Sequence, residues 1–186
     1  GGSNAISLTE LFNGTSWTEV NNMNTARHNM GNAGTSTAAL TFGGAVTAGV
    51  ALAESWNGTS WTEVADLNTA RTTLAGAGSQ TSAIAFGGGT PGGNVAITES
   101  WNGSGWTEVA DLATARVNLA GSGTTGISAL AIGGSPGNWT TTTNSTEEFT
   151  GATITDTIKN EGQVYYNSAS NVLKLTGVVY GTGIWA

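Results

Sequence analysis

Acidic and aromatic side chains recur together in one short motif, and both types could take part in chemistry. Residues 54–64 read ESWNGTSWTEV, residues 99–109 repeat this as ESWNGSGWTEV, and residues 10–20 give the looser version ELFNGTSWTEV. Paired carboxyl groups are the acid and base, or the acid and nucleophile, of glycoside hydrolysis. Aromatic rings beside them could stack on a sugar. Each copy of the motif is therefore a candidate carbohydrate site.

The repetition itself favours a structural role over a catalytic one. Catalysis needs one differentiated site, whereas these acids and aromatic residues occur in every copy. We expect the aromatic side chains to pack between neighbouring repeat units, and each Glu to pair with a recurring Arg or to cap backbone groups. The arginines should hydrogen-bond these acids or loop carbonyls. The residues concerned are Phe12, Trp17, Trp56, Trp61, Trp101, Trp106, Arg27, Arg71 and Arg116.

The spacing of the repeat indicates the size of the unit that positions these residues. The second aromatic of the motif recurs as Trp17, Trp61 and Trp106, at intervals of 44 and 45 residues. The arginines follow the same intervals, and segments 55–71 and 100–116 agree at 14 of 17 positions. A period near 45 is too long for a helical hairpin repeat and suits a unit of four strands.

Strands can be identified within one period by alternation. SAIAFGG at 82–88 alternates small and large residues and ends in a Gly pair, and LAGAGS at 74–79 is suited to strands that converge closely. The Asn-Gly at 57–58 predicts a two-residue type I′ hairpin, which would place Trp56 opposite Thr59 and Glu54 opposite Trp61. Helical periodicity is not sustained anywhere, so the predicted fold class is all-β.

The repeat resembles the kelch motif. In that motif a Gly-Gly pair closes one strand, an aromatic residue and then a Trp follow, and an Arg comes about ten residues later, as here over residues 1–150. The resemblance implies a β-propeller of four-stranded blades. The glycines concerned are Gly43, Gly44, Gly87, Gly88, Gly133 and Gly134. The amino-acid sequence of the repeat also resembles kelch-type structural proteins (tail fibres and appendages) of tailed bacteriophages, especially those from marine samples.

Some kelch-type propellers are copper radical oxidases, whose chemistry requires Cys, Tyr and two His. The sequence has no Cys, and His28 is its single His, so that branch is excluded for this chain. A lone His also argues against a His-based metal centre or a catalytic triad. We therefore expect no enzyme activity, no metal and no cofactor.

The expected strands amount to about three and a half four-stranded blades, over residues 5–22, 28–67, 72–112 and 117–150. Closed propellers typically have 4–8 blades. We therefore expect either a partial propeller within a longer chain or a ring completed by other copies as a homo-oligomer. Residues 1–151 form the predicted propeller part. Residues 152–186 lose the repeat and predict a C-terminal β-hairpin for docking or oligomerisation, with GQVYYN and VLKLTG as its strands.

Composition excludes several classes of protein. Only 9% of residues are charged, against about 25% in an average protein. The net charge of −7 argues against nucleic-acid binding, which needs a basic surface to neutralise phosphates. The sequence shows no apolar run long enough to span a bilayer. The absence of Cys excludes disulfides and thiolate metal sites.

The segments that differ between repeats are the better candidates for binding, because function on a rigid scaffold is concentrated in such connections. They are residues 45–51, 90–96 and 135–145, and the longest of them supplies the candidate glycan-binding residues Asn138, Trp139 and Thr140. Two further sets of residues have weaker functional interpretations. Asp66 and Asp111 could bind Ca²⁺ but are more often turn formers. The glycosylation motifs at Asn13, Asn57, Asn102, Asn138 and Asn144 mostly coincide with predicted turns, where Asn tolerates a left-handed backbone.

The expected function is that of a non-enzymatic virion structural or adhesion protein: a tail fibre, adhesin or decoration protein on the virion surface. Its partners would be other virion proteins and a host-surface glycan. The alternative is a kelch protein-interaction scaffold in a cell, cytoplasmic or secreted, and the weakest candidate is a carbohydrate-active enzyme.

Overall fold

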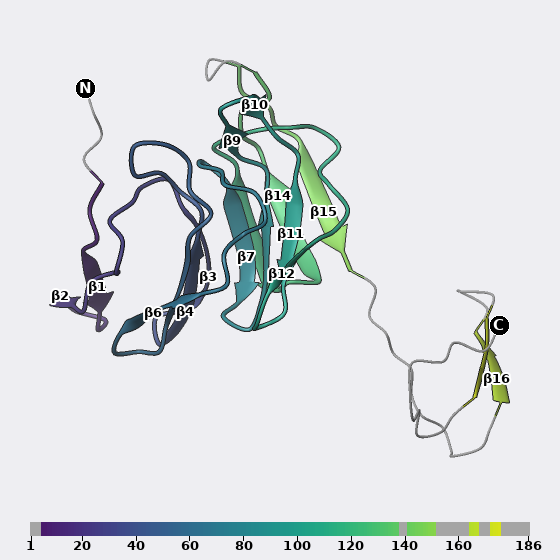
Figure 1. Ribbon diagram of the computed structural model, residues 1–186, viewed down its shortest axis with the longest axis horizontal. Helices are drawn as coiled ribbons and strands as arrows, with labels where there is room; N and C mark the ends of the chain where they lie inside the picture. The colour runs from purple at the N-terminus through teal and green to yellow at the C-terminus, as the bar shows by residue number, and fades with distance from the viewer. Residues whose placement is uncertain (1–4, 138–140, 152–163, 168–171, 176–186) are drawn as a thin grey trace. The chain divides into compact units, whose positions relative to one another are not determined.

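The computed structural model describes residues 5–137, 141–151, 164–167 and 172–175 (Figure 1). The chain divides into two compact units, unit 1 over Gly1–Ala152 and unit 2 over Thr153–Ala186. Every regular element in the described residues is a β-strand, which confirms the predicted all-β class. The same residues contain no helix with the length and hydropathy of a membrane span.

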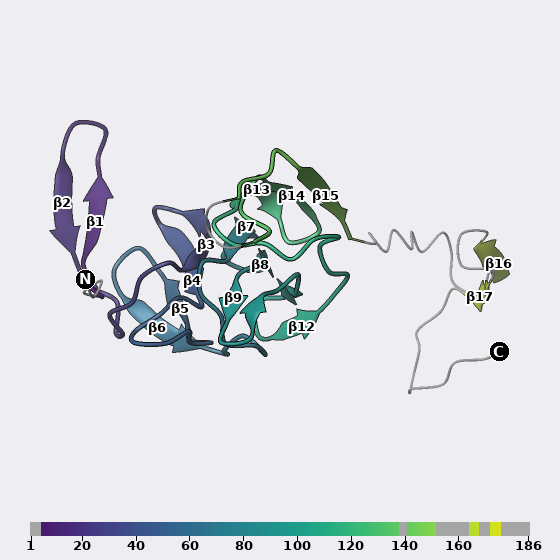
Figure 2. The same ribbon diagram turned by 90° about the horizontal axis from the view of Figure 1, so that it is seen from above.

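Unit 1 consists of antiparallel sheets that follow one another along the chain (Figures 1 and 2). The N-terminal hairpin pairs β1 with β2. The first sheet has the order β3-β4-β5-β6, the second β7-β8-β11-β12 and the third β13-β14-β15. A small hairpin, β9-β10, forms the connection that leads from β8 to β11 in the sequence. The strands of the hairpin and the first sheet are β1 Thr9–Phe12, β2 Trp17–Val20, β3 Gly31–Thr35, β4 Ala38–Phe42, β5 Ala53–Trp56 and β6 Trp61–Val64. The rest are β7 Ala75–Ser79, β8 Ser82–Phe86, β9 Gly89–Thr90, β10 Gly93–Asn94, β11 Thr98–Trp101, β12 Trp106–Glu108, β13 Ala120–Thr125, β14 Ser128–Ile132 and β15 Thr146–Thr150.

The hairpins that carry the repeated motif have a four-residue loop, so the predicted two-residue type I′ turn is wrong. Trp56 lies opposite Trp61 and Glu54 opposite Glu63. The backbone N–H of Asn57 donates to the carbonyl of Ser60, which closes the loop. Only the glycine of the Asn-Gly pair has a positive φ, 91° at Gly58. The loop therefore needs the left-handed conformation at one position instead of two.

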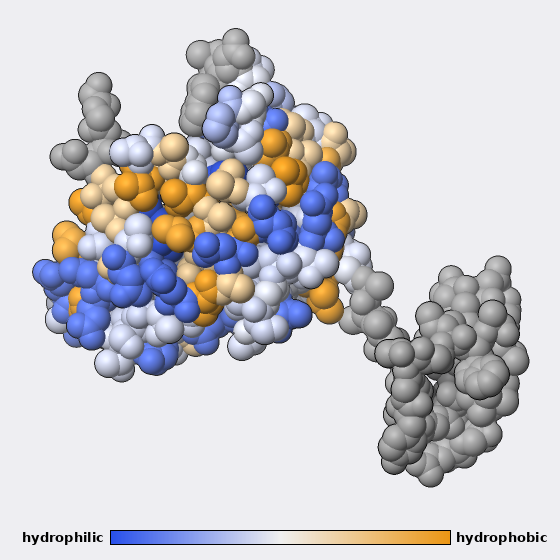
Figure 3. Space-filling model, viewed as in Figure 1, coloured by the Kyte–Doolittle hydropathy of each residue, from blue (hydrophilic) through white to orange (hydrophobic). Residues whose placement is uncertain are grey.

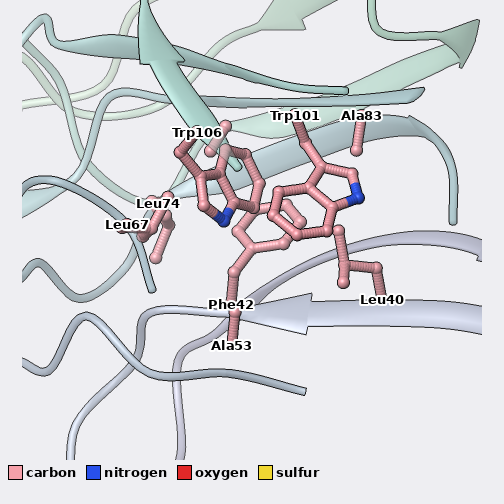
Figure 4. Close-up of a cluster of buried hydrophobic side chains, with 9 residues drawn as sticks. Leu40, Phe42, Ala53, Leu67, Leu74, Ala83, Trp101 and Trp106 are labelled. Carbon is pink, nitrogen blue, oxygen red and sulfur yellow. The ribbon is translucent and has the colours of Figure 1, made fainter. Parts of the chain in front are cut away.

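The main core lies between the first and second sheets (Figure 4). Trp101 and Trp106, from the two strands of the β11-β12 hairpin, lie against Phe42 of β4, and the rings of Phe42 and Trp106 are 4.9 Å apart in an edge-to-face arrangement. Leu40 and Phe42 are completely buried. Large aromatic side chains bury much apolar surface and gain further from this geometry. The hydrophobic contact thus joins two consecutive repeat units.

The first strands of the three sheets approach one another closely because they are rich in small residues. A Cβ atom at Gly76 of β7 would lie 2.7 Å from the carbonyl oxygen of Asn32 on β3. A Cβ atom at Gly121 of β13 would collide with the carbonyl oxygen of Gly76. The small-residue composition of 74–79, which predicted converging strands, is explained by these contacts.

Unit 2 contains one antiparallel hairpin in its described residues. Its strands are β16 Val164–Asn167 and β17 Val172–Leu175, with Val164 opposite Leu175 and Asn167 opposite Val172. Both strands coincide with segments that the sequence predicted to be extended.

Candidate functional site

The repeated arginines and glutamates meet in buried clusters that anchor the linkers between sheets. In the second sheet, Arg71 precedes β7 and Glu99 lies on β11, and Arg71 Nη1 is 3.1 Å from Glu99 Oε1. Neither side chain is exposed to solvent. Glu99 also accepts hydrogen bonds from the backbone N–H and the side-chain amide of Asn68, at 2.7 and 2.9 Å. The same Asn68 amide donates to the carbonyl of Trp106 on β12.

The first sheet contains the same cluster. Arg27 Nη1 is 2.6 Å from Glu54 Oε1, and both side chains are at most 1% exposed. Asn24 donates its backbone N–H and its side-chain amide to Glu54, and the amide also reaches the carbonyl of Trp61. Sequence reasoning missed the roles of Asn24 and Asn68. The signal was present, since Asn stands three positions before Arg in both NTAR segments.

The third cluster is less complete. Arg116 Nη2 is 2.9 Å from Glu147 Oε1, but the glutamate side chain is 27% exposed. Ala113 replaces the asparagine, so only its backbone N–H donates to Glu147. Arg116 also donates to the carbonyl of Ser145, and its hydrogen bond to the carbonyl of Ala131 corresponds to the one from Arg71 to Ala85 in the second sheet. A buried charge requires a partner and hydrogen bonds. Each of the three arginines has a glutamate partner and at least one hydrogen bond, and the buried Nε of each has no hydrogen-bond partner among the described residues.

The electrostatics of these clusters are those of a structural ion pair. Burial lowers the pKa of the Arg71 guanidinium, and the negative charges of Glu99, Asp111 and Glu108 partly offset this effect. The pKa of an arginine starts so high that the group stays protonated. Glu54 and Glu99 are therefore held as buried counter-ions, out of reach of a sugar, whereas the second glutamate of each motif, such as Glu63 or Glu108, is exposed.

The Gly-Gly pairs at the ends of the second strands explain why the linker arginine is held in place. Gly87 and Gly88 have positive φ values of 63° and 108°, and the N–H of Gly88 donates to the carbonyl of Arg116. A Cβ atom at Gly87 would lie 2.7 Å from that carbonyl oxygen. Gly43 and Gly44 make the equivalent contact with Arg71. Gly133 and Gly134 share the positive φ values.

The paired aromatic residues differ in exposure from one hairpin to the next. Trp56 and Trp101 are 3% exposed and Trp106 is 8% exposed, whereas Phe12 and Trp17 of the N-terminal hairpin are 48% and 65% exposed. Trp61 is half-buried, and its Nε1 donates to Thr9 Oγ1 of β1. The two aromatic residues of each hairpin contact each other, with ring centroids 5.1 to 5.3 Å apart.

The asparagines and aspartates of the repeat are occupied by backbone hydrogen bonds. Asn57 Oδ1 accepts from the N–H groups of Thr59 and Ser60, and Asn13 and Asn102 do the same in their own loops. The expectation that these asparagines supply a left-handed backbone was wrong, because positive φ occurs at the following glycine. Asp66 accepts from the N–H of Ala53, and Asp111 accepts from that of Thr98. Both carboxylates thus fix neighbouring strands.

The connections between second and third strands are the segments that vary between sheets. The connection in the second sheet forms the β9-β10 hairpin, and Asn94 at its end donates to the carbonyls of Ser135 and Gly137 in the connection of the third sheet. Ser135 is buried, and its hydroxyl donates to the carbonyl of Thr141. Neighbouring connections are thus tied to each other. The candidate binding residues Asn138, Trp139 and Thr140 lie outside the described residues.

A small cavity of about 50 Å³ lies between the second and third sheets. Phe86, Leu112, Phe149 and Glu147 are among the residues that line it. Phe86 occupies the position in β8 that Phe42 occupies in β4, and Phe149 occupies the position in β15 that Trp101 occupies in β11. Between the first two sheets the corresponding space is filled by Trp106, which contacts Phe42. A volume of this size takes a few water molecules at most.

The described residues contain no group of three or more His, Cys, Asp or Glu side chains that could hold a metal ion. His28 pairs through its backbone with Ala45 at the start of the first variable connection. On one face of the molecule, hydrophobic and hydrophilic residues are interspersed (Figure 3). Comparison of the sequence with protein-family models and with curated proteins gives no match.

Proposed function

We propose that unit 1 is a set of kelch-type β-propeller blades and that the chain is a non-enzymatic structural and adhesion protein of a tailed-phage virion. The resemblance of the repeat to the kelch motif and to phage appendage proteins supports the family and the source. The succession of antiparallel sheets, two of them four-stranded, is compatible with blades.

One observation supports the non-enzymatic role above the others. The recurring arginines pair with one glutamate of each sheet, and in the first two sheets an asparagine also binds that glutamate, as Arg71, Glu99 and Asn68 illustrate. Glu54, Glu99 and Glu147, which could do acid-base chemistry, thus hold linkers. What differs between units is the set of connections between second and third strands, and variable connections on a rigid scaffold are where binding is concentrated.

The virion assignment is tested by mass spectrometry of purified phage particles. We expect peptides of this chain in particles that have been banded by density and washed at high salt. A known capsid protein of the same particle serves as the positive control. Detection in the lysate of infected or uninfected cells, with none in particles, would contradict the proposal and favour the cellular interaction scaffold.

The adhesion role is tested by exchanging one variable connection. In this variant, residues 135–144 (SPGNWTTTTN) are replaced by the AVTAGVA of residues 45–51, which occupies the corresponding place in the first sheet. Ser145 is kept because its carbonyl accepts hydrogen bonds from Arg116 and from the N–H of Gly133. The exchange should preserve the sheets and lower binding of the chain to host cells and to their surface polysaccharide. The matched control is the converse exchange at 45–51. Equal binding by the wild type and both variants would refute a role for this connection.

A further inference from the structure

The outer face of the third sheet carries apolar side chains that the first two sheets bury at the same positions. Leu40 and Ile84 are fully buried, whereas Leu130 is 39% exposed. One position further along the face, Phe42 is 0% and Phe86 2% exposed, whereas Ile132 is 40% exposed. We call Leu130 and Ile132, with the neighbouring Thr146 and Glu148 of β15, the β14 face.

The N-terminal hairpin shows the opposite half of the same arrangement. Phe12 and Trp17 lie opposite each other on β1 and β2, as Trp101 and Trp106 do on β11 and β12. The ring centroids of Phe12 and Trp17 are 5.1 Å apart at an interplanar angle of 40°, and those of Trp101 and Trp106 are 5.3 Å apart at 41°. The aromatic pair of the N-terminal hairpin therefore already has the geometry of the buried pair, yet its two side chains are exposed to solvent.

The contact between the first and second sheets shows what such a pair covers. There, Trp101 and Trp106 cover Leu40 and Phe42, and the four side chains belong to one core cluster (Figure 4). The exposed Phe12 and Trp17 correspond to the two tryptophans, and the exposed Leu130 and Ile132 correspond to the residues beneath them. Unit 1 thus presents both halves of a contact that it already makes internally.

We propose that the β14 face of one chain receives the N-terminal hairpin of a second copy of the same chain. In this head-to-tail contact, Phe12 and Trp17 of one copy cover Leu130 and Ile132 of the other. Such a contact uses two different surfaces and leaves one of each free at the ends, so it propagates until a ring closes or a filament forms. The contact rests on the geometry of unit 1 and is independent of the proposed virion role.

The apolar side chains of the two surfaces favour their association, and the negative charge of the chain opposes it. Burial of aromatic and aliphatic side chains drives association, and a preformed aromatic pair loses little conformational freedom on binding. The net charge of −7 makes copies repel one another, and Glu148 stands on the receiving face where Ser55 and Ser100 stand in the first two sheets. Added salt screens this repulsion, so association should strengthen as the salt concentration rises.

The first measurement is the mass of the 186-residue chain in solution, by light scattering after size-exclusion chromatography and by sedimentation over a wide range of concentrations. We expect species larger than a monomer. Leu130→Asp with Ile132→Asp, or Phe12→Ser with Trp17→Ser, should raise the dissociation constant about 30-fold or more, as expected for loss of an interface anchor. Val46→Ser is the matched control, because Val46 is 40% exposed and lies in the connection between β4 and β5, outside the two surfaces defined above.

A mixing experiment tests the direction of the contact and guards against loss of folding. Each double variant keeps one intact surface, so each should be monomeric alone. Mixed in equal amounts, they should form a heterodimer that grows no further, because the intact hairpin of one meets the intact β14 face of the other. Far-ultraviolet circular dichroism of each variant alone checks that the strands remain.

Three results would overturn the inference. The first is a wild-type chain that stays monomeric at every concentration and salt level. The second is assembly that persists in both double variants, which would assign it to another surface such as unit 2. The third is a mixture of two folded variants that stays monomeric. Detection in virions would be unaffected by any of these results, so failure of the interface and failure of the proposed function are distinguishable.

Discussion

Arg71 and Glu99 form an ion pair although they lie 28 positions apart in the sequence: the arginine lies in the linker before β7, and the glutamate lies on β11. The pair is fully buried and is reinforced by hydrogen bonds from Asn68. The linker that contains Arg71 connects β6 of the first sheet to β7 of the second. The cluster therefore fixes the position of the first sheet's last strand relative to the second sheet.

Substitution of Glu99→Gln should lower the free energy of unfolding strongly. It leaves the buried Arg71 guanidinium without its counter-ion, and breaking a buried pair in this way costs about 3–5 kcal/mol. Urea denaturation followed by tryptophan fluorescence measures the change. Glu63→Gln on exposed β6 is the control and should alter stability by less than about 0.5 kcal/mol. Equal effects of the two substitutions would contradict the structural role of the pair.

Gly87→Ala should destabilise unit 1 by about 1–3 kcal/mol, because the position has a φ of 63° and a Cβ atom would lie 2.7 Å from the carbonyl oxygen of Arg116. Gly105→Ala is the matched control. Nothing lies within 4 Å of its Cβ position, so the alanine should be neutral or stabilise the fold by up to about 1 kcal/mol. Thermal unfolding of both variants gives the comparison, and a stabilising Gly87→Ala would refute the close approach.

Trp106→Ala should cost about 3–5 kcal/mol, since it removes a ring that packs against Phe42 in the core between the first two sheets. Trp17→Ala removes the equivalent ring of the N-terminal hairpin, which is 65% exposed, and should cost less than about 1 kcal/mol. Urea denaturation, at protein concentrations where the chain is monomeric, measures the loss of stability in each of the two variants. Similar losses would mean that Trp17 is buried within its own chain.

Asn57→Ala should destabilise the fold by about 1–2 kcal/mol, because it removes an acceptor for two backbone N–H groups, each 2.9 Å from Asn57 Oδ1. Asn57→Asp keeps an acceptor in the same place and should stay within about 0.5 kcal/mol of the wild type. Denaturant titration of the two variants provides the measurement. If Asn57→Asp lowered the free energy of unfolding as much as Asn57→Ala does, the two hydrogen bonds would not be the source of the stability that asparagine provides.

The fold class and the size of the repeat unit could be predicted because both depend on periodicity. Alternation at 82–88 and the small residues at 74–79 correspond to β8 and β7. Both faces of β8 are buried, and one takes small side chains while the other takes Ile84 and Phe86. Close approach at the first strand likewise selects small residues in β7. The recurrence of Arg and Glu likewise marked residues that every unit requires.

The register of the motif hairpins could not be predicted from the same signals. Asn-Gly favours a two-residue turn, but in this chain Asn57 Oδ1 accepts two backbone N–H groups and closes a four-residue loop. The gain is that Trp56 lies directly opposite Trp61, which allows the two rings to pack. Packing of the aromatic pair therefore overrides the local preference of the turn.

The exposure of Phe12 and Trp17 was equally hidden in the sequence. The motif at 10–20 has nearly the same residues as the two later copies, so composition gives no sign of a different environment. Exposure depends on whether a neighbouring sheet is present, which is a property of tertiary arrangement.

The position of each Arg–Glu ion pair within its repeat determines which segments can be duplicated or deleted. From Arg27 to Glu54, from Arg71 to Glu99 and from Arg116 to Glu147, each arginine meets a glutamate of its own repeat and never one of the next. A segment cut from just before one linker to just before the following linker therefore carries both members of its buried pair. Duplicating or deleting such a segment leaves no guanidinium without its counter-ion. The natural module for shuffling or engineering this protein begins at the asparagine of NTAR.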